Sequence, residues 1–296
     1  MTRFNMTSGN SFAIAAAIAL GSIRSQAATP GAWETFSTQT NAKAWTVYDF
    51  SDEGYYIPTW DDSEPGFEYI KRYHSGDNAL IFFADDQAGN EALIGDYVAA
   101  NVGSISCEIY IEDLTEFYST DCTVYADGPD GPTTYYSEQY FFDDFDASGW
   151  WKIKYSFDRP WFYYDADTEE YVQVADNESF LHNILELNFG FYPEIDSTLG
   201  MLSGLDEVKL EPRLEPSNLT TKVENGQFKL SFTKLPAVSY DLEKLSQAAP
   251  FTWSPVSGQA GQTSPGESLF STPTNQGREI FHVVSEPVYT KIVTQP

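Results

Sequence analysis

Basic residues are nearly missing from the middle of the chain. Between Arg72 and Lys152 the sequence runs 79 residues without a lysine or an arginine, and that stretch carries 16 aspartates and glutamates. Residues 28–216 hold 38 acidic and 8 basic side chains, whereas residues 217–296 hold six of each. Because like charges repel, this surface argues against nucleic acid and anionic membranes as partners. The break in charge predicts two domains.

Histidine and methionine are also scarce, with three of each. The histidines stand far apart in the sequence, and no Walker loop, glycine-rich nucleotide fingerprint or paired-histidine metal motif is present. Tyrosine and phenylalanine, by contrast, number 19 and 21. Because aromatic residues favour strands, this composition predicts an all-β protein. The missing catalytic motifs favour a protein that is not an enzyme.

Long apolar runs are absent except near the N-terminus. Arg3 precedes the run Phe12–Leu20, and Ser25 to Ala27 offer small residues for cleavage after Ala27. The run is shorter than the roughly 20 residues that a membrane span needs. We therefore expect a signal peptide over residues 1–27, a secreted or cell-surface protein, and no membrane span in the mature chain.

Short alternating runs separated by turn residues predict the fold. Over residues 28–212 they indicate a jelly-roll β-sandwich that carries most of the acidic residues. Pro212 and Pro216 interrupt strand pairing, so residues 213–220 are expected to form a linker. Residues 221–296 then predict a smaller antiparallel β-sandwich. One short helix is expected at residues 178–183, capped by Asn177.

The chain has only two cysteines, Cys107 and Cys122. An even pair in an exported protein favours a disulfide, which would contribute about 3 kcal/mol by restricting the unfolded chain. A hairpin with its tip near residues 113–116 would place the two cysteines opposite each other. The same register would place Glu108 opposite Asp121 on the outer side.

Several segments of the first domain resemble a known family. The segments are Gly103–Ser106 with Thr123–Tyr125, Gly149–Lys152, Phe180–Leu187 and Leu205–Leu210. Their order resembles the laminin IV (domain B) type of jelly roll, in the galactose-binding-like group. The family pattern has Asp-Asn before the last valine, where this chain has Asp206-Glu207. The resemblance implies an extracellular binding or adhesion module.

The second domain is similar to fibronectin type III-like or immunoglobulin-like C-terminal modules of secreted bacterial proteins. The residues that carry this resemblance are Phe228–Phe232, Ser239–Glu243, Trp253 and Arg278–Val283. The resemblance implies a spacer or a surface-attachment unit and brings no functional residue with it.

Carbohydrate is the partner that the aromatic segments favour. Sugar rings stack on aromatic side chains, while carboxylates and amides bind the hydroxyl groups. The loop around Tyr55–Trp60 has this composition, and a second aromatic group, Trp161–Tyr164 near Tyr135, Tyr136 and Trp150, is an alternative. The ligand-binding residues predicted from the first segment are Tyr55, Tyr56, Trp60, Asp61 and Asp62.

Calcium is the cofactor that the acidic residues suggest, because this hard cation takes six to eight oxygen ligands. Jelly rolls of the resembled type join an early loop to the final strand through one structural calcium ion. The ligands predicted on this basis are Asp49, Asp52, Glu53 and Asp206. The alternative is that the acidic loops are simply solvated.

The sequence is compatible with three functions. The favoured one is an extracellular module that recognises carbohydrate or matrix with the help of calcium. The second is a non-catalytic structural surface protein whose acidity suits high salt. The third is a glycoside hydrolase that uses Glu108 and Glu112, which are four residues apart and so share one face of a strand.

Overall fold

The computed structural model describes residues 28–292 apart from residues 65, 75–77, 86–89, 129–130, 195–199, 216, 226, 249–250, 256–260, 265–266 and 274–280. The expected signal peptide and residues 278–280 of the fibronectin-like pattern therefore lie outside the described residues. The regular structure of the described chain consists of strands with only short helices, which confirms the predicted all-β class. None of its helices combines the length and the apolar character that crossing a membrane requires.

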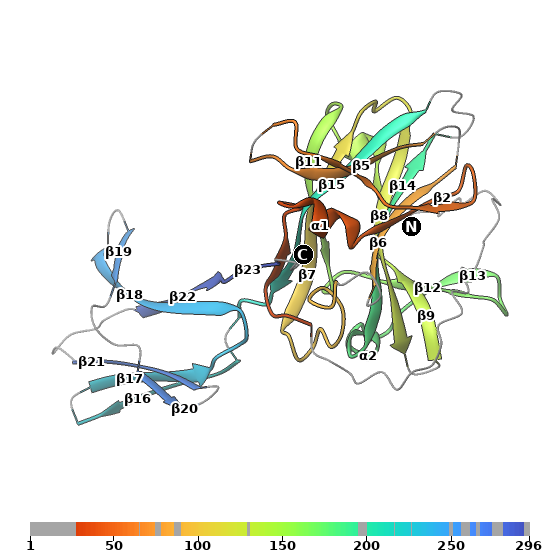
Figure 1. The fold of residues 1–296 in the computed structure, drawn as a ribbon. Coiled ribbons are helices and arrows are strands. Elements are labelled where there is room, and N and C mark those ends of the chain that lie inside the picture. Colours follow the sequence, from red (N-terminus) through yellow and green to blue (C-terminus); the bar gives the residue numbers. More distant parts are fainter. Residues whose placement is uncertain are drawn as a thin grey trace.

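The first domain is a sandwich of two sheets (Figure 1). The seven-stranded sheet has the order β11-β7-β15-β1-β23, with β5 beside β15 and β4 beside β5. Its strands are β1 (Ala32–Glu34), β4 (Thr59–Asp61), β5 (Tyr69–His74), β7 (Val102–Ile111), β11 (Gly149–Ser156), β15 (Met201–Pro212) and β23 (Thr290–Lys291).

The nine-stranded sheet has the order β13-β12-β9-β8-β14-β6-β2-β3, with β10 beside β8. Its strands are β2 (Thr46–Asp49), β3 (Gly54–Tyr56), β6 (Leu80–Asp85), β8 (Phe117–Gly128), β9 (Gly131–Tyr136), β10 (Tyr140–Phe141), β12 (Phe162–Asp165), β13 (Glu170–Gln173) and β14 (Ile184–Pro193). Both sheets alternate buried and exposed side chains, because successive side chains of a strand point to opposite faces.

Two short helices and one turn of 3-10 helix complete the first domain: α1 (Gln39–Lys43), η1 (Phe142–Asp144) and α2 (Glu178–Leu181). The helix α2 was expected, but Asn177 makes no side-chain cap there. Its amide instead donates to the carbonyl oxygens of Phe157 and Arg159, at 2.7 and 2.8 Å. Asn177 therefore holds the turn after β11 rather than the helix.

The interior between the sheets is filled from both sides. Ile105, Ile109 and Ile111 of β7 lie in the same buried cluster as Val124 of β8 and Phe189 of β14. Burying a side chain of this size contributes about 1.5–3 kcal/mol, so this cluster is the main source of stability of the first domain.

The predicted hairpin between Cys107 and Cys122 is wrong. The strands β7 and β8 belong to different sheets, so Cys107 lies opposite Ile153 of β11 and Cys122 lies opposite Phe189 of β14. Both cysteines are buried, free thiols, and no disulfide joins them. Burial raises the pKa of both thiols well above the usual value.

We expect the native protein to be insensitive to reducing agent. Dithiothreitol should leave the melting temperature unchanged, because there is no cross-link to break. A native disulfide would instead lower stability by about 3 kcal/mol on reduction. Mass spectrometry after alkylation checks this: the denatured protein should take two alkyl groups without prior reduction. A protein that is two hydrogens lighter and takes up no alkyl group would contain a disulfide and would contradict the expectation.

The second domain is a small sandwich of two sheets, as expected from its length. The four-stranded sheet has the order β16-β17-β21-β20 and the three-stranded sheet has the order β19-β18-β22. Their strands are β16 (Ser217–Glu224), β17 (Gln227–Thr233), β18 (Val238–Ala248), β19 (Phe251–Pro255), β20 (Gly261–Ser264), β21 (Glu267–Pro273) and β22 (Phe281–Pro287). The strand β16 begins at Ser217, within residues 213–220, where the sequence predicted a linker.

The chain returns to the first domain after β22. The strand β23, which the sequence assigned to the second domain, pairs in parallel with β1 of the first. Thr290 donates its backbone N–H to Gly31 at 2.8 Å, and Val288 donates to Ala237 of the second domain at 2.8 Å. Figure 1 shows this return beside β7 and β15. The second domain is therefore tied to the first by two connections.

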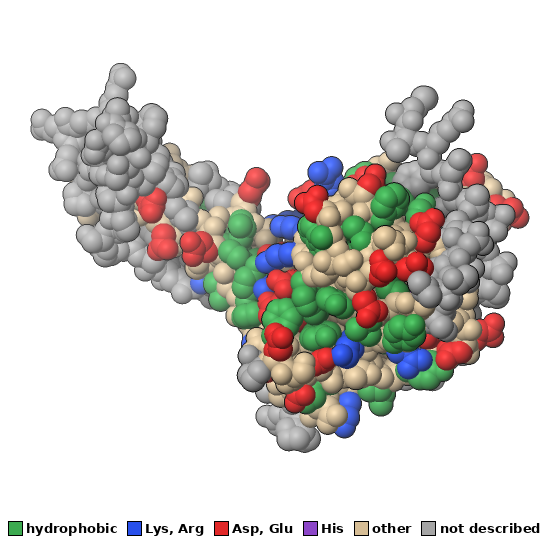
Figure 2. All heavy atoms as spheres, turned by 90° about the horizontal axis from the view of Figure 1, so that it is seen from above, with side chains coloured by type: hydrophobic (Ala, Val, Ile, Leu, Met, Phe, Trp, Pro, Cys, Tyr) green, Lys and Arg blue, Asp and Glu red, His purple; other side chains and the backbone are tan. Residues whose placement is uncertain are grey.

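The lysines of the first domain are unevenly placed. Among residues 28–216 the chain has five lysines, and the strands of the nine-stranded sheet carry none. Four of the five lie on β5, β11 and β15 of the seven-stranded sheet: Lys71, Lys152, Lys154 and Lys209. Figure 2 shows few blue side chains against many red ones on the first domain, with several of the blue ones close to the second domain.

Candidate ligand-binding face

The outer side of the nine-stranded sheet carries rows of aligned side chains. Residues directly opposite each other on paired strands share a face, so the register defines the rows. One row reads Tyr55, Tyr48, Ile81, Gly190, Asp121. The next reads Thr46, Phe83, Asn188, Thr123, Tyr136, Phe162, Gln173. A third reads Asp85, Glu186, Tyr125, Thr134.

Aromatic rings gather at the two ends of these rows. At one end Tyr55 is 59% exposed and its ring lies 4.7 Å from Tyr48 and 6.0 Å from Phe83. At the other end Tyr171 is 41% exposed and lies 5.3 Å from Tyr136 and 5.4 Å from Tyr164. We call this whole surface the tyrosine face.

Polar groups fill the middle of the tyrosine face. Asp121 is 2% exposed, and the Tyr192 hydroxyl donates to its carboxylate at 3.2 Å. Burial raises the pKa of Asp121 to about 6, although the hydrogen bonds from Tyr192 and Gln139 oppose that rise. A Cβ at Gly190 would meet Asp121 Oδ1 at 2.5 Å, so glycine is required beneath this pair.

Beside Asp121, two further polar side chains lie in the middle of the face. Asn188 donates to Thr123 Oγ1 at 3.2 Å, whereas its own Oδ1 is buried and has no hydrogen-bond partner among the described residues. Burial raises the pKa of Glu186, and the neighbouring Asp85 raises it further. An unpaired buried acceptor costs about 1–3 kcal/mol, so Asn188 reduces the stability of the sheet at this point.

The structure separates the predicted ligand-binding residues. Tyr55 lies on the tyrosine face, but the adjacent Tyr56 points to the other side of β3. There Tyr56 donates to Asp52 Oδ2 at 2.5 Å, and the Arg72 guanidinium lies 3.7 Å from its ring centre. Tyr56 is therefore occupied by contacts within the protein.

The other three predicted ligand-binding residues lie on or beside β4 of the seven-stranded sheet. Trp60 packs against the core and donates its Nε1–H to the carbonyl of Phe36 at 2.8 Å. Asp61 pairs with Lys71, which holds the pKa of that carboxyl well below its usual range. Asp62 is exposed. The structure thus does not bring these residues together with Tyr55.

The four predicted calcium ligands do not form one cluster: Asp49 and Asp52 lie together, but Asp206 lies in the other sheet. Asp49 and Asp52 face Arg72, whose Nη2 lies 3.4 and 3.9 Å from their carboxylates. Glu53 occupies the turn before β3 with φ +52, and Asp206 lies on β15 in the opposite sheet. In the described part of the chain no group of three or more acidic, cysteine or histidine side chains is arranged to hold a metal ion.

Asp206 has an unusual environment of its own. It is 4% exposed, lies opposite Glu108 in the register, and accepts a hydrogen bond from the Glu207 N–H at 2.7 Å. Burial is the main reason that the pKa of Asp206 is raised to about 8; the charges of Glu207, Glu108 and Glu34 add to the rise, and the hydrogen bond from the Glu207 N–H opposes it. Asp206 is therefore largely protonated at neutral pH when no cation is bound.

The carboxylates considered for hydrolysis have other neighbours. Glu108 lies opposite Lys152 on one side and Asp206 on the other, so the predicted opposition of Glu108 and Asp121 is wrong. Glu112 follows β7 and accepts the Leu202 N–H at 2.9 Å.

The other end of the tyrosine face contains part of the alternative aromatic group that the sequence named, together with Tyr171, which the sequence did not name. The alternative aromatic group, Trp161–Tyr164, is divided by the alternation of β12. Trp161 is buried in the core, whereas Phe162 and Tyr164 share the outer face with Tyr136 and Tyr171. This end could have been recognised from the sequence, because in residues 162–164 and 171–173 every second side chain lies on the same face of its strand.

No protein-family model matches the chain, and no curated protein matches it. Among solved structures, the L4b domain of human laminin alpha-2 is similar at 13% identity, with a TM-score of 0.41, over 62% of this chain and 98% of that one. The carbohydrate-binding module CBM28, specific for non-crystalline cellulose, has 10% identity and a TM-score of 0.35, over 62% and 93%.

A β-1,2-glucanase from Parabacteroides distasonis has 10% identity and a TM-score of 0.38, over 90% of this chain and 40% of that one. These likenesses are too distant to carry an argument about function. The class of the protein follows from its own strands: it is an all-β protein of two sandwich domains.

Proposed function

We propose that this protein recognises carbohydrate outside the cell and binds an extended, neutral polysaccharide along the tyrosine face. The observation that carries the proposal is the arrangement of this face, with exposed rings at both ends and polar side chains between them. Rings stack on the apolar side of a sugar, and carboxylate and amide groups accept its hydroxyl hydrogens.

The length of the face favours a polymer over a single sugar. Tyr55 on β3 and Tyr136 on β9 are separated by five strand spacings, about 24 Å at roughly 4.8 Å per strand. One sugar ring is much shorter than this distance. A ligand that contacts both aromatic ends therefore consists of several linked sugars that run across the strands.

The charge of the face favours a neutral ligand. Glu186 and Asp85 lie opposite each other in its third row, and the nine-stranded sheet has no lysine on any strand. Carboxylates would repel an anionic polymer, whereas they accept hydrogen bonds from neutral hydroxyl groups.

Replacing an exposed ring at either end tests the proposal. We expect Tyr55→Ala and Tyr171→Ala each to weaken binding about tenfold, because losing one stacked ring costs on the order of 1.4 kcal/mol. Affinity electrophoresis against a panel of neutral polysaccharides measures this. Tyr73→Ala is the matched control, because Tyr73 is 57% exposed but lies on β5 of the other sheet.

The outcomes separate the two candidate functions. Retention that falls in both face variants and persists in Tyr73→Ala supports recognition of carbohydrate. If no neutral polysaccharide is retained, or if Tyr73→Ala is equally damaging, the proposal fails and a non-catalytic structural surface protein is favoured. Calcium assistance stays a prediction, and the same gels run with calcium and with EDTA test it.

A further inference from the structure

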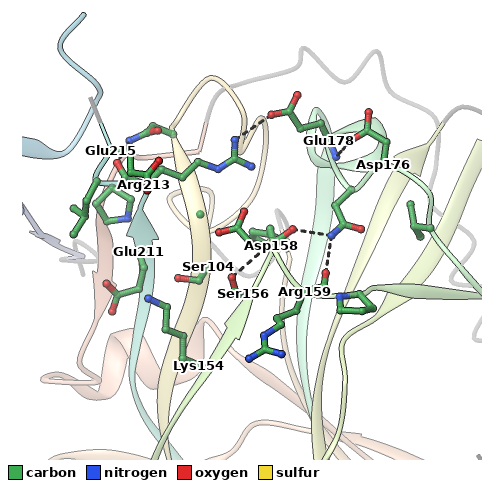
Figure 3. A pocket seen from close by; sticks show the side chains of 18 of the residues that line it. Ser104, Lys154, Ser156, Asp158, Arg159, Asp176, Glu178, Glu211, Arg213 and Glu215 are labelled. Atoms are coloured by element: carbon green, nitrogen blue, oxygen red, sulfur yellow. Dashed lines mark hydrogen bonds and ion pairs between the residues drawn. The ribbon is translucent and has the colours of Figure 1, made fainter. Parts of the chain in front are cut away.

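A cleft, which we call the junction cleft, lies where the two domains meet (Figure 3). Its volume is about 1050 Å³, at the upper end of the range found for ligand sites. Its walls include Lys154 of β11, the turn Phe157–Pro160 after that strand, the segment Val174–Glu178, the end of β15 with the following Arg213–Glu215, and Leu235 of the second domain.

The walls of this cleft are held in place by hydrogen bonds. The Asn177 amide joins the two loops of the first domain through the carbonyls of Phe157 and Arg159. The Asn101 amide donates to the carbonyl of Arg213 at 2.9 Å and to that of Pro236, in the second domain, at 3.2 Å. The cleft is therefore formed before a ligand arrives, which lowers the cost of binding.

Two cations in the cleft have no partner. Lys154 and Arg159 are exposed, and in the described part of the chain neither forms an ion pair. In the same domain Lys71, Arg72 and Lys209 are paired with carboxylates, whereas Lys43 and Lys152 also form no ion pair among the described residues but lie outside the cleft. The chain has a net charge of −28 and few basic residues. Two unpaired cations in one cleft therefore indicate a site for an anionic ligand.

Five acidic side chains also line the cleft, and Glu211 lies beside Lys154 in Figure 3, but no ion pair joins any of the five to Lys154 or Arg159 in the described structure. Glu178 pairs with Arg213 at 3.0 Å, and Glu211 accepts Ser106 Oγ at 2.6 Å and Tyr289 Oη at 2.5 Å. In Figure 3 Glu178 and Asp176 lie at the upper end of the cleft, whereas Lys154 and Arg159 lie at the lower end. Asp158 lies between the two ends and is free to accept a hydroxyl hydrogen.

We infer that the junction cleft binds an anionic saccharide, a sugar that carries carboxylate or sulfate groups beside its hydroxyls. The anionic group pairs with Lys154 and Arg159, because an ammonium and a guanidinium both bind oxyanions well. The hydroxyls of the same sugar donate to Asp158, which a simple inorganic anion would leave unpaired. This inference is independent of the tyrosine face.

Calorimetric titration of the full chain tests the inference with three probes. They are a galacturonate hexamer, a sulfated galactan oligomer, and the same galacturonate hexamer with its carboxyls reduced to alcohols. We expect one of the anionic probes to bind and the reduced hexamer not to bind at the cleft; the probe that binds identifies the group as carboxylate or sulfate.

The variants locate the site. The double substitution Lys154→Gln, Arg159→Gln should lower the affinity for the anionic probe at least tenfold. Lys152→Gln should change its affinity less than twofold, since Lys152 is also exposed on β11 but does not line the cleft. Tyr55→Ala should leave it unchanged. Failure of both anionic probes to bind, or an equal loss in Lys152→Gln, overturns the inference; loss of neutral binding alone does not.

Discussion

Replacing Asp206 by asparagine should stabilise the protein at pH 8 and leave its stability unchanged at pH 4. The carboxyl group of Asp206 is buried beside Glu108 and Glu207, which raises its pKa to about 8. An aspartate in an unfolded chain has a pKa of about 3.9. Asparagine keeps the oxygen that accepts the Glu207 N–H but never carries a charge.

The sign of this effect follows from where the proton is released. Because the folded-state pKa lies above the unfolded-state value, the unfolded chain loses the proton first as pH rises. Rising pH therefore favours unfolding throughout the window from about pH 4 to pH 8. Between pH 5 and pH 8 the native protein should lose about 3 kcal/mol that the variant keeps.

Urea denaturation at pH 5 and pH 8 in the presence of EDTA measures the difference. Asp62→Asn is the control, because Asp62 is exposed and its replacement should change stability by less than about 0.5 kcal/mol. Parallel curves for the native protein and Asp206→Asn would contradict the expectation. Repeating the titration in calcium tests the predicted metal role, since a ligand to calcium would make the variant the less stable protein.

Replacing Gly31 by alanine should loosen the junction between the domains. Gly31 has φ +65, and a Cβ there would lie 2.3 Å from the carbonyl oxygen of Val288 and 2.9 Å from Ala237 Cβ. The added methyl group is unfavourable for two reasons: the left-handed backbone conformation and the close contact with the Val288 carbonyl oxygen. We expect a cost on the order of 2–4 kcal/mol, borne by the pairing of β1 with β23.

Calorimetry and small-angle scattering measure the outcome. The variant should show a separate, earlier transition for the second domain and a larger radius of gyration. Gly66→Ala is the matched control, because Gly66 also has a positive φ of +83 but no atom lies within 4 Å of its added Cβ. If both variants melt alike, the contact with Val288 does not hold the domains together.

The sequence predicted strands better than their partners. The alternation around Cys107, Ile109 and Ile111 gave β7 and its buried face correctly. It did not show that β7 and β8 enter different sheets, because alternation identifies a face of a strand and not its neighbour. After the isolated bridge of Gly95 to Ile184 the chain forms a turn at residues 97–100, and the Asp96 carboxylate accepts the Ala99 N–H at 2.9 Å.

The candidate site was predicted only in part, because Pro58 separates two of the predicted residues. Tyr55 and Trp60 are close in sequence, but Pro58 stands between β3 and β4, and proline cannot donate to a strand ladder. The chain crosses there from one sheet to the other, so the predicted group was divided. Asn188 and Tyr136 join Tyr55 through long-range strand pairing, which a single sequence does not show.

The uneven placement of lysine has a practical use. Reagents that couple to primary amines will attach the first domain to a sensor chip or a bead mainly through its exposed lysines, which are Lys152 and Lys154 on β11 and Lys43 on α1. The nine-stranded sheet will then point toward the solution without any engineered tag. The same coupling modifies Lys154 and so obstructs the junction cleft, which means that one immobilised sample reports on only one of the two surfaces.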